Sequence, residues 1–360
     1  MTRKIGIVGY GVYIPEFRLA AEEIWKTWAQ RYTPQAINDI MGLTEIAVDS
    51  WHDDVITMAS DAGKAAMEMA GIPSEKIGAV YLGTCTNPYV TKASATIVAE
   101  SIDLGPELFS CDCQFGSKSG TSSLQVCAAM VGAGMIDYGI SIGSDSLASH
   151  TAPNDWPYEY SAAAGAAAYI LGHEGIFAEI EHLYSFATDT TDFFRLDGDR
   201  YLTRGLAQEE EFIGYDRHIS SAVTRFVTKF GYRVSDFAHV VLHQRNGVEP
   251  IVLGKKLGFS DEQIRSSIIA DKIGDCGSAC SLLALGSTLD EAKPGQKVLV
   301  ASYGHGSGSD VFSLKIHEEI DKARERRRIY LSVKEQINNR IPITYSEYLR
   351  MQRKIIQEYV

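Results

Sequence analysis

The chain has 360 residues, of which 45% are hydrophobic and 22% charged, a globular balance that excludes the disordered and collagen-like classes. Its formal net charge of −12 argues against a broad basic face for nucleic acid but is compatible with a local basic pocket for a phosphorylated ligand. Six cysteines are few for this length, so we expect free thiols, a reducing cytoplasm and no disulfide framework.

The first apolar segment, IGIVGYGVYIP, follows two basic residues, as a signal peptide would. It is rich in glycine, ends at Pro15 and has no small-residue cleavage site, so it predicts a buried first strand and turn instead. The longest other apolar stretch, residues 161–172, is too short to span a bilayer. We therefore expect a soluble protein that does not enter a membrane.

A weak internal repeat runs through the chain with an offset of 160 residues. Segments 70–87 and 230–247 each show a helical pattern, a turn and a short apolar strand. Segments 115–146 and 273–310 each show a turn, a helix and a strand, in the same order along the chain. Because strands alternate with amphipathic helices, we predict a duplicated α/β body of parallel sheets and helices, with its site between the halves.

This pattern divides the chain into an N-terminal half at 1–175, a C-terminal half at 176–317 and a helical tail at 318–360. The tail begins with a charged, helical segment and continues after Pro342 as a short amphipathic helix. The tail caps the body, docks a partner or is a solvated terminal helix.

The stretch FGSKSGTSSLQ places Ser117 in a glycine-flanked turn between an apolar strand and the start of a helix. A helix N-terminus offers N–H groups and partial positive charge to a developing anion, a geometry that suits a nucleophile. The alternative is a helix start capped by Ser117 and Ser119, with no chemistry.

Further along the chain, His243 ends an apolar strand and opens a turn, where a histidine is either an acid–base group or a satisfied structural donor. Asp275 lies in a glycine-rich start of a helix and could orient a histidine or bind substrate. The loop SYGHGSGSD contains His305, Gly306 and Ser307 and can bring backbone N–H groups close to a ligand. Its glycines do not match a dinucleotide fingerprint.

The cysteines do not predict a metal centre. Cys111 and Cys113 are one residue apart, and Cys276 and Cys280 are three apart, so neither pair forms a Cys-x-x-Cys knuckle. No histidine follows them at zinc-finger spacing. We expect no metal site and no tightly bound cofactor.

Motifs over nearly the whole chain carry a resemblance to a known family: GIVGYGVYIP at the start, NPY at 87–89, KSGTSSLQVCAAMVGAGMIDYG at 118–139, HQRNG at 243–247 and the SYGHGSGSD loop. Together they resemble hydroxymethylglutaryl-CoA synthase, particularly its archaeal branch, within the thiolase superfamily. The resemblance implies a duplicated thiolase fold, an α/β structure of two similar halves in a five-layered αβαβα body, and a homodimer.

The family's mechanism uses a cysteine that acetyl-CoA acetylates, a glutamate that acts as acid and base, and a histidine that positions the acetoacetyl-CoA thioester. By resemblance, His243 keeps the histidine position. Ser117 stands at the cysteine position and Cys85 at the glutamate position. A chain without both groups should not be a competent synthase, because serine is the poorer nucleophile and a thiol replaces the proton-transferring carboxyl group.

Other positions follow the same resemblance. Asp275 stands where an asparagine usually assists, and His305 where a small residue usually lies near the oxyanion site. Lys255 and Lys256 follow the His243 strand and are candidates for contacts with coenzyme A phosphates, although paired surface lysines are usually only solvated.

Within the superfamily the pattern resembles the synthase-like subunit of the bacterial complex that acylates phloroglucinols. That complex joins a cysteine-bearing thiolase subunit, a synthase-like subunit and a small OB-fold protein with a zinc ribbon. Our first hypothesis is therefore a subunit of such an acyltransferase, with acyl-CoA or a small acyl acceptor as its ligand. The alternatives are an autonomous acyl-CoA-dependent enzyme that uses Ser117 or Cys85, and a non-catalytic scaffold.

Overall fold

The computed structural model describes residues 3–29, 32–114, 116–205 and 208–355. The strands are β1 (Gly6–Tyr13), β2 (Phe17–Ala20), β3 (Glu45–Val48), β4 (Ile77–Gly83), β5 (Phe109–Cys113), β6 (Tyr138–Ser146), β7 (Ala164–Gly172), β8 (Ala178–Phe186), β9 (Phe193–Phe194), β10 (Thr203–Arg204), β11 (His239–Leu242), β12 (Lys297–Ala301), β13 (Ser309–Ile316) and β14 (Ile341–Ile343).

The α-helices are α1 (Ala21–Trp28), α2 (Pro34–Met41), α3 (Val55–Ala70), α4 (Ser94–Ser101), α5 (Ser119–Gly132), α6 (Leu147–His150), α7 (Gln208–Phe230), α8 (Glu249–Lys256), α9 (Asp261–Arg265), α10 (Ala270–Ile273), α11 (Cys280–Glu291), α12 (Glu319–Arg326), α13 (Val333–Asn338) and α14 (Tyr345–Met351). Short 3₁₀ turns are η1 (Ser74–Lys76), η2 (Tyr158–Tyr160), η3 (Val234–Asp236) and η4 (Gly277–Ala279).

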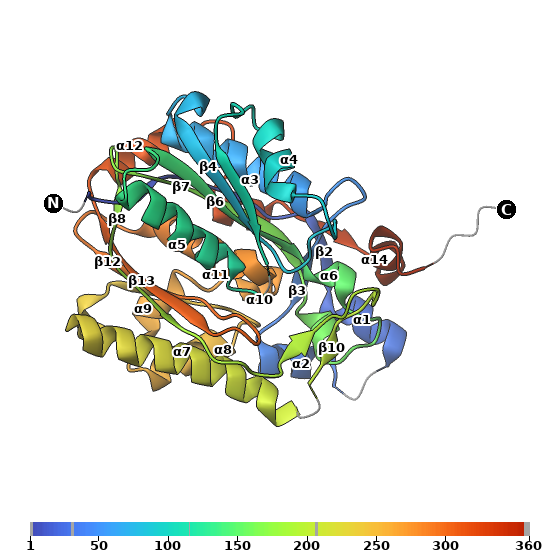
Figure 1. The fold of residues 1–360 in the computed structure, drawn as a ribbon. Helices are drawn as coiled ribbons and strands as arrows, with labels where there is room; N and C mark the ends of the chain where they lie inside the picture. The colour runs from blue at the N-terminus through green and yellow to red at the C-terminus, as the bar shows by residue number, and fades with distance from the viewer. Residues whose placement is uncertain (1–2, 30–31, 115, 206–207, 356–360) are drawn as a thin grey trace.

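The main sheet has nine strands in the order β11-β12-β13-β8-β1-β7-β6-β4-β5. Its two arms meet where β1 pairs with β8 over only two residue pairs, Gly6–Glu179 and Ile7–Ala178. Figure 1 shows the resulting layers: α3 and α4 above the upper arm, α5 and α11 between the arms, and α7, α8 and α9 below the lower arm. This arrangement agrees with the predicted five-layered αβαβα body, with the two arms facing each other across the middle helices.

The structure repeats itself at the offset that the sequence indicated. Helices α3 and α7 end at Ala70 and Phe230, and η1 and η3 begin at Ser74 and Val234, each pair 160 residues apart. Helix α5 of the first half corresponds to helix α11 of the second half, and together they form the middle layer. The boundaries at 175/176 and 317/318 stay a prediction.

The glycines of β1 allow α3 to lie directly on the sheet. A Cβ atom added at Gly11 would lie 2.3 Å from the carbonyl oxygen of Ala62, and one at Gly9 would lie 2.6 Å from that of Ala66. Either side chain would push α3 away from the strand and open the core. The GYG motif therefore serves close packing, and the segment forms the buried first strand that the sequence predicts.

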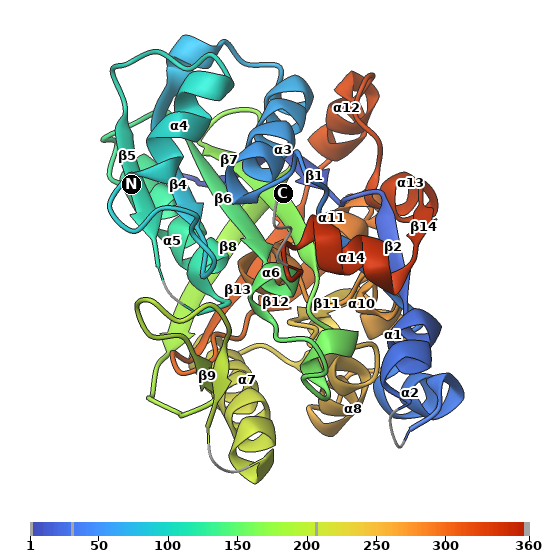
Figure 2. The same cartoon turned by 90° about the vertical axis from the view of Figure 1, so that its right-hand side faces the viewer.

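The C-terminal tail caps the body. Strand β14 pairs in parallel with β2, and Figure 2 shows β14 and α14 beside that strand. Tyr345 and Tyr348 of α14 are buried. The Tyr345 hydroxyl donates to Glu159, 2.6 Å away, and accepts from the indole N–H of Trp28 at 2.8 Å. Of the three alternatives left open for the tail, the structure shows the cap.

Asp49 is a buried carboxyl group beneath this tail. Its Oδ1 accepts hydrogen bonds from Ser146 Oγ at 2.9 Å and from Gln352 Nε2 at 3.0 Å. Burial raises the pKa of Asp49 to about 6. The native state therefore holds this proton more tightly than the unfolded chain, so the carboxyl group lowers stability above pH 6 and ceases to do so as the pH falls towards 4.

The variant Asp49→Asn keeps the acceptor oxygen and cannot ionise. Relative to the parent chain, it should gain up to about 3 kcal/mol in the free energy of unfolding at pH 7.5, and much less near pH 4. Urea unfolding at both pH values measures this difference. The exposed Asp321→Asn variant should show no such dependence, and an Asp49→Asn effect that is equal at both pH values would contradict the assignment.

Among the described residues, no helix combines the length and the apolar character that crossing a membrane requires.

Candidate active site

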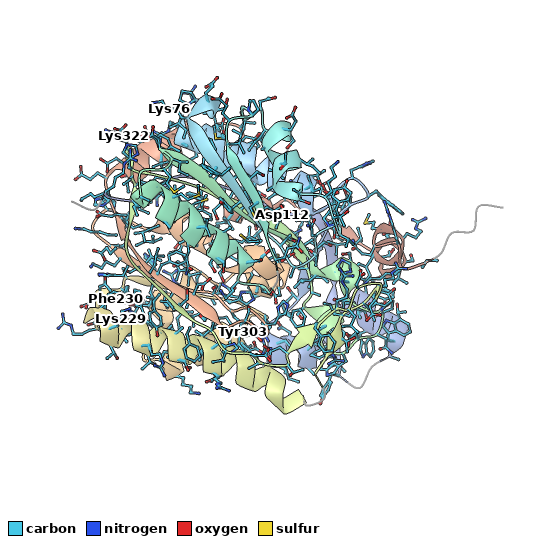
Figure 3. The ribbon with its side chains drawn as sticks, in the orientation of Figure 1. Lys76, Asp112, Lys229, Phe230, Tyr303 and Lys322 are labelled. Atoms are coloured by element: carbon cyan, nitrogen blue, oxygen red, sulfur yellow. The ribbon has the colours of Figure 1, made fainter. Side chains whose placement is uncertain are left out.

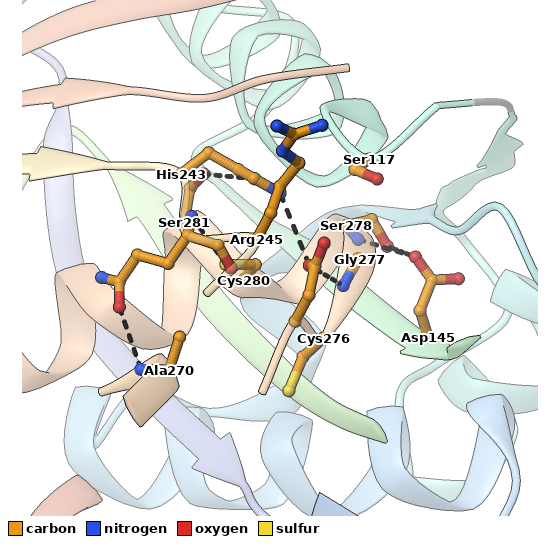
Figure 4. Close-up of polar contacts among 12 residues, drawn as sticks. Ser117, Asp145, His243, Arg245, Ala270, Cys276, Gly277, Ser278, Cys280 and Ser281 are labelled. Atoms are coloured by element: carbon orange, nitrogen blue, oxygen red, sulfur yellow. Dashed lines mark hydrogen bonds and ion pairs between the residues drawn. The ribbon is translucent and has the colours of Figure 1, made fainter. Parts of the chain in front are cut away.

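The candidate site lies where strand ends and helix starts of the two halves meet, as Figure 4 shows. Ser117 precedes α5, and Asp145 lies near the end of β6. From the second half, His243 follows β11, while Asp275 and Ser278 precede α11. The first half therefore supplies the serine and the second half supplies the histidine.

Ser117 is 3% exposed, and its Oγ lies 2.9 Å from Nδ1 of His305. It does not cap a helix: α5 begins at Ser119, and its N-cap residue, Lys118, makes no side-chain capping bond. The capping interpretation of Ser117 and Ser119 is therefore wrong. The preceding strand, β5, is also a half-exposed edge strand rather than a buried apolar one.

His305 is held as a neutral ring. Burial lowers its pKa to about 3. The backbone N–H of Ser117 also points at Nδ1, at 3.4 Å, and because an N–H group only donates, Nδ1 acts as the acceptor. Phe193 stacks on the imidazole with ring centroids 3.5 Å apart, which fixes the plane of the ring. The sequence indicated neither Phe193 nor the contact with Ser117.

His243 is fully buried between the halves. Its Nε2 lies 3.5 Å from Oδ1 of Asp275, and its Nδ1 lies 3.2 Å from the hydroxyl of Ser281. The same Asp275 oxygen accepts the backbone N–H of Gly277 at 2.9 Å, which fixes the carboxylate. The structure therefore brings together the histidine and the aspartate that the sequence singled out.

Cys280 also approaches this pair: one ligand atom from each of His243, Asp275 and Cys280 lies within 4.8 Å of the others. Burial raises the pKa of Cys280 well above its ordinary value, and its thiol lies 3.3 Å from the carbonyl oxygen of Gln244. A metal would need the thiolate, so these contacts favour a hydrogen-bonded thiol. The expected absence of a metal stays a prediction.

Cys85 lies in the loop that follows β4, where it is hydrogen-bonded to Asp145. Its backbone N–H donates to Asp145 Oδ1 at 2.8 Å, and its thiol donates to Oδ2 at 3.1 Å. Burial and the adjacent carboxylate raise the pKa of the Cys85 thiol well above its ordinary value. The sulfur is therefore held in the thiol form, which is a poor nucleophile.

Asp145 joins three segments of the site. Besides Cys85, it accepts the backbone N–H and the hydroxyl of Ser278, each at 2.6 Å, and the hydroxyl of Thr86 at 2.6 Å. Thr86 belongs to the loop after β4, and Ser278 to the turn before α11. The sequence analysis missed Asp145, although three polar residues at the end of an apolar strand were a usable signal.

The glycine-rich loop between β12 and β13 is arranged differently from the prediction. The backbone N–H of Gly306 donates to Asp192 Oδ2 at 2.9 Å, so it is not free for an oxyanion. The buried hydroxyl of Tyr303, labelled in Figure 3, donates to the same oxygen. Ser307 Oγ is buried and has no hydrogen-bond partner among the described residues. Within this loop, the serine hydroxyl rather than the glycine amide is available.

A cavity of about 460 Å³ opens beside the turn that follows His243. Most of its wall is apolar or aromatic, with Arg245 and Glu249 as a buried ion pair whose N–O distance is 2.8 Å. Trp156 and Tyr158 line one side, and Val252 of α8 lines another. An apolar pocket of this size with few polar groups is typical of a small-molecule site.

The two lysines at the end of α8 are exposed and paired. Lys255 Nζ lies 2.8 Å from Asp261, and Lys256 Nζ lies 2.7 Å from Asp216. Asp216 also lines the cavity, so Lys256 stands near its rim while Lys255 is paired elsewhere on the surface.

Curated relatives align along almost the full chain. The hydroxymethylglutaryl-CoA synthase of Methanopyrus kandleri is 39% identical over 357 residues, which cover 98% of this chain and 99% of that protein. The synthase of Archaeoglobus fulgidus is 40% identical over 354 residues, with 98% and 99% covered. This chain belongs to the hydroxymethylglutaryl-CoA synthase family.

Other comparisons match part of the chain or its fold. The sequence profile described as 3-Oxoacyl-[acyl-carrier-protein (ACP)] synthase III C terminal matches residues 227–315. A solved HMG-CoA synthase complexed with CoA has a TM-score of 0.86 at 18% identity, covering 98% of this chain and 92% of its own. The curacin-pathway HMG synthase complexed with acetyl donor-ACP has a TM-score of 0.84 at 17% identity, covering 97% and 88%. At these identities the two structures show the fold alone.

Proposed function

We propose that this chain is the synthase-like subunit of a thiolase-type acyltransferase complex. A partner thiolase supplies the nucleophilic cysteine, and a small OB-fold protein with a zinc ribbon completes the assembly. The observation that supports this proposal is the state of Cys85, which stands where the resemblance places the acid–base glutamate. Its half-buried thiol donates to Asp145 and keeps its proton. Carbon–carbon bond formation needs a group that moves a proton, and this thiol does not supply it.

The chain retains features that suit an acyl thioester. His243 and Asp275 lie together, and the 460 Å³ cavity opens beside the following turn. The similar structures include one complexed with CoA and one complexed with acetyl donor-ACP. We propose that acyl-CoA is a substrate rather than a bound cofactor, with Lys256 at the rim facing its phosphates and Lys255 as a weaker candidate.

The edge strand β5 supports the proposed homodimer. Phe109 is 50% exposed, and Cys111 is exposed on the same strand. Because β5 ends the sheet, one of its edges has unpaired backbone groups that a second copy can pair with across a twofold axis. The cysteines are all free, which is consistent with the proposed cytoplasmic location.

The alternatives differ in their support. Cys85 is disfavoured as a nucleophile because it is held as a thiol. A pure scaffold has no need of the buried His243–Asp275 pair or of an open apolar cavity. An autonomous role for Ser117 is favoured by one specific observation, its hydrogen bond to His305.

The test compares the purified chain alone with the chain co-expressed with a cysteine-bearing thiolase and an OB-fold zinc-ribbon protein. We expect no hydroxymethylglutaryl-CoA from the chain alone, a stable three-protein complex on gel filtration, and acyl transfer by that complex to a phloroglucinol acceptor. A chain that forms hydroxymethylglutaryl-CoA alone, at a rate unchanged by the partners, would show that the proposal is wrong. A complex whose activity does not require this chain would show the same.

A further inference from the structure

Ser117 and His305 form a hydrogen-bonded pair from opposite halves of the chain, separated by 188 residues in sequence. Ser117 Oγ lies 2.9 Å from Nδ1 of His305, within the distance at which a base removes a hydroxyl proton. Since Nδ1 also faces the backbone N–H of Ser117, it carries no proton of its own. The serine hydroxyl therefore donates to a ring nitrogen that is free to accept.

The surroundings keep this pair in place. Phe193 stacks on the imidazole, and Asp192 anchors the loop through the N–H of Gly306. Gly306 has φ +67° and Gly116 has φ +79°, backbone conformations that favour glycine, on the two sides of the contact. A Cβ atom at Gly116 would lie 2.6 Å from Ser307 Oγ, so the two loops touch with no space between them. The distance between Ser117 and His305 is set by backbone packing.

Two further features suit a developing oxyanion. Ser117 lies just before the 14-residue helix α5, whose N-terminus carries partial positive charge. The hydroxyls of Ser119 and Ser307 are buried and have no partner among the described residues. Ser119 is 3% exposed, and Ser307 Oγ lies beside Gly116. A buried hydroxyl without a partner costs stability unless a ligand engages it.

Two aromatic rings separate the cavity from the pair. Tyr158 lines the cavity and makes an edge contact with Phe193, with centroids 5.8 Å apart. Phe193 in turn covers His305. A thioester that enters the cavity meets Ser117 once these rings move aside.

We infer that Ser117 and His305 form a serine–histidine dyad that takes an acyl group from a thioester as an ester on Ser117. The inference rests on the proposed acyl-thioester function of the chain and adds a nucleophile and its base. The Ser117 oxygen bonds to the thioester carbonyl carbon while its proton moves to His305 Nδ1. The carbon–sulfur bond then breaks, the sulfur takes up that proton and leaves as a thiol, and the acyl group stays on Ser117.

The test is peptide-resolved mass spectrometry of the intact, purified chain after incubation with acetyl-CoA. A fluorophosphonate probe is used in parallel, because it labels an activated serine without needing recognition of coenzyme A. We expect both reagents to modify Ser117, and neither to modify that peptide in Ser117→Ala. His305→Phe keeps a ring against Phe193 but removes the base, so the labelling rate should fall by about 10²–10⁴-fold.

Two controls separate a base from a structural support. His317→Ala removes a histidine that is paired with Glu179 at another place on the chain, so it should leave labelling unchanged. His305→Ala should regain part of the labelling rate when imidazole is added, because the free base can occupy the vacated space. Melting temperatures confirm that each variant is folded.

The dyad is overturned if a folded chain shows no modification of Ser117 by either reagent, or if His305→Phe leaves the labelling rate unchanged. Gel filtration with the thiolase and OB-fold partners tests the proposed function independently of the dyad. An intact, active complex with an unlabelled Ser117 refutes the dyad alone. A labelled Ser117 in a chain that joins no complex refutes the proposed partners and supports the dyad.

Discussion

Asp145→Ala is expected to lower the free energy of unfolding by about 3–5 kcal/mol, because it removes the one carboxylate on which several buried donors depend. Asp145 is fully buried. It accepts hydrogen bonds from Ser278 across the interface between the halves, and from Cys85 and Thr86 on the β4 loop. Alanine would remove the acceptor of the backbone N–H groups of Cys85 and Ser278 and of the buried Thr86 hydroxyl.

Urea unfolding at neutral pH measures this loss. Asp145→Asn should show part of it, since its oxygen can still accept from the β4 loop while its NH₂ group would face the donors of Ser278. Asp321→Ala is the control, because its carboxylate is exposed and paired only with Arg324 one turn away, and its effect should stay within about 0.5 kcal/mol. A loss below about 1 kcal/mol for Asp145→Ala would contradict the role assigned to this carboxylate.

The second large effect concerns Ser117 and Cys85, the two positions at which the resemblance implies that this chain differs from its family. Ser117→Cys should form a stable acetyl thioester from acetyl-CoA, since sulfur is a far better nucleophile than a hydroxyl oxygen and this position precedes the N-terminus of α5. It should still make no hydroxymethylglutaryl-CoA, because Cys85 remains a protonated thiol bound to Asp145.

Adding Cys85→Glu to Ser117→Cys should raise the rate of hydroxymethylglutaryl-CoA formation by about 10²–10⁴-fold, the usual contribution of a general acid–base group. Burial and the neighbouring Asp145 would keep the new carboxyl group protonated and able to act as an acid. Mass spectrometry of the product from acetyl-CoA and acetoacetyl-CoA gives the rate.

Thr228→Glu in the same Ser117→Cys background is the control, because Thr228 is exposed on α7, away from the proposed dimer edge. That variant should show no increase in product. If Ser117→Cys alone forms hydroxymethylglutaryl-CoA at the rate of the double variant, then Cys85 does not occupy the acid–base position.

Local patterns predicted much of the fold. The glycine-rich first segment forms β1, and the repeat at an offset of 160 recurs in helix ends and 3₁₀ turns. These features could be predicted because strand and helix periodicity, turn residues and glycine positions depend on neighbours along the chain. The sequence also singled out His243 and Asp275, since polar residues at a strand end and at a helix start face the same edge of an α/β body.

The local sequence pattern gave the wrong interpretation of residues whose hydrogen-bond partners lie in a distant part of the chain. Ser117 fits a helix cap by its neighbours, yet its hydroxyl is bonded to His305 from the opposite half. Gly306 fits an oxyanion loop, yet its N–H is taken by Asp192. Asp145 was missed because its importance comes from donors on two distant segments, the loop after β4 and the turn before α11.

The sequence by itself determined the α/β class, the duplication, the family to which the chain is similar and the residue types at the site. Only the tertiary structure decided which of those residues touch, which hydroxyls are free and which thiols keep their protons. The physical reason is that periodicity and turns are local properties of the chain. Hydrogen bonds such as Ser117–His305, and pKa shifts such as that of Cys85, arise from burial and partners that packing the two halves creates.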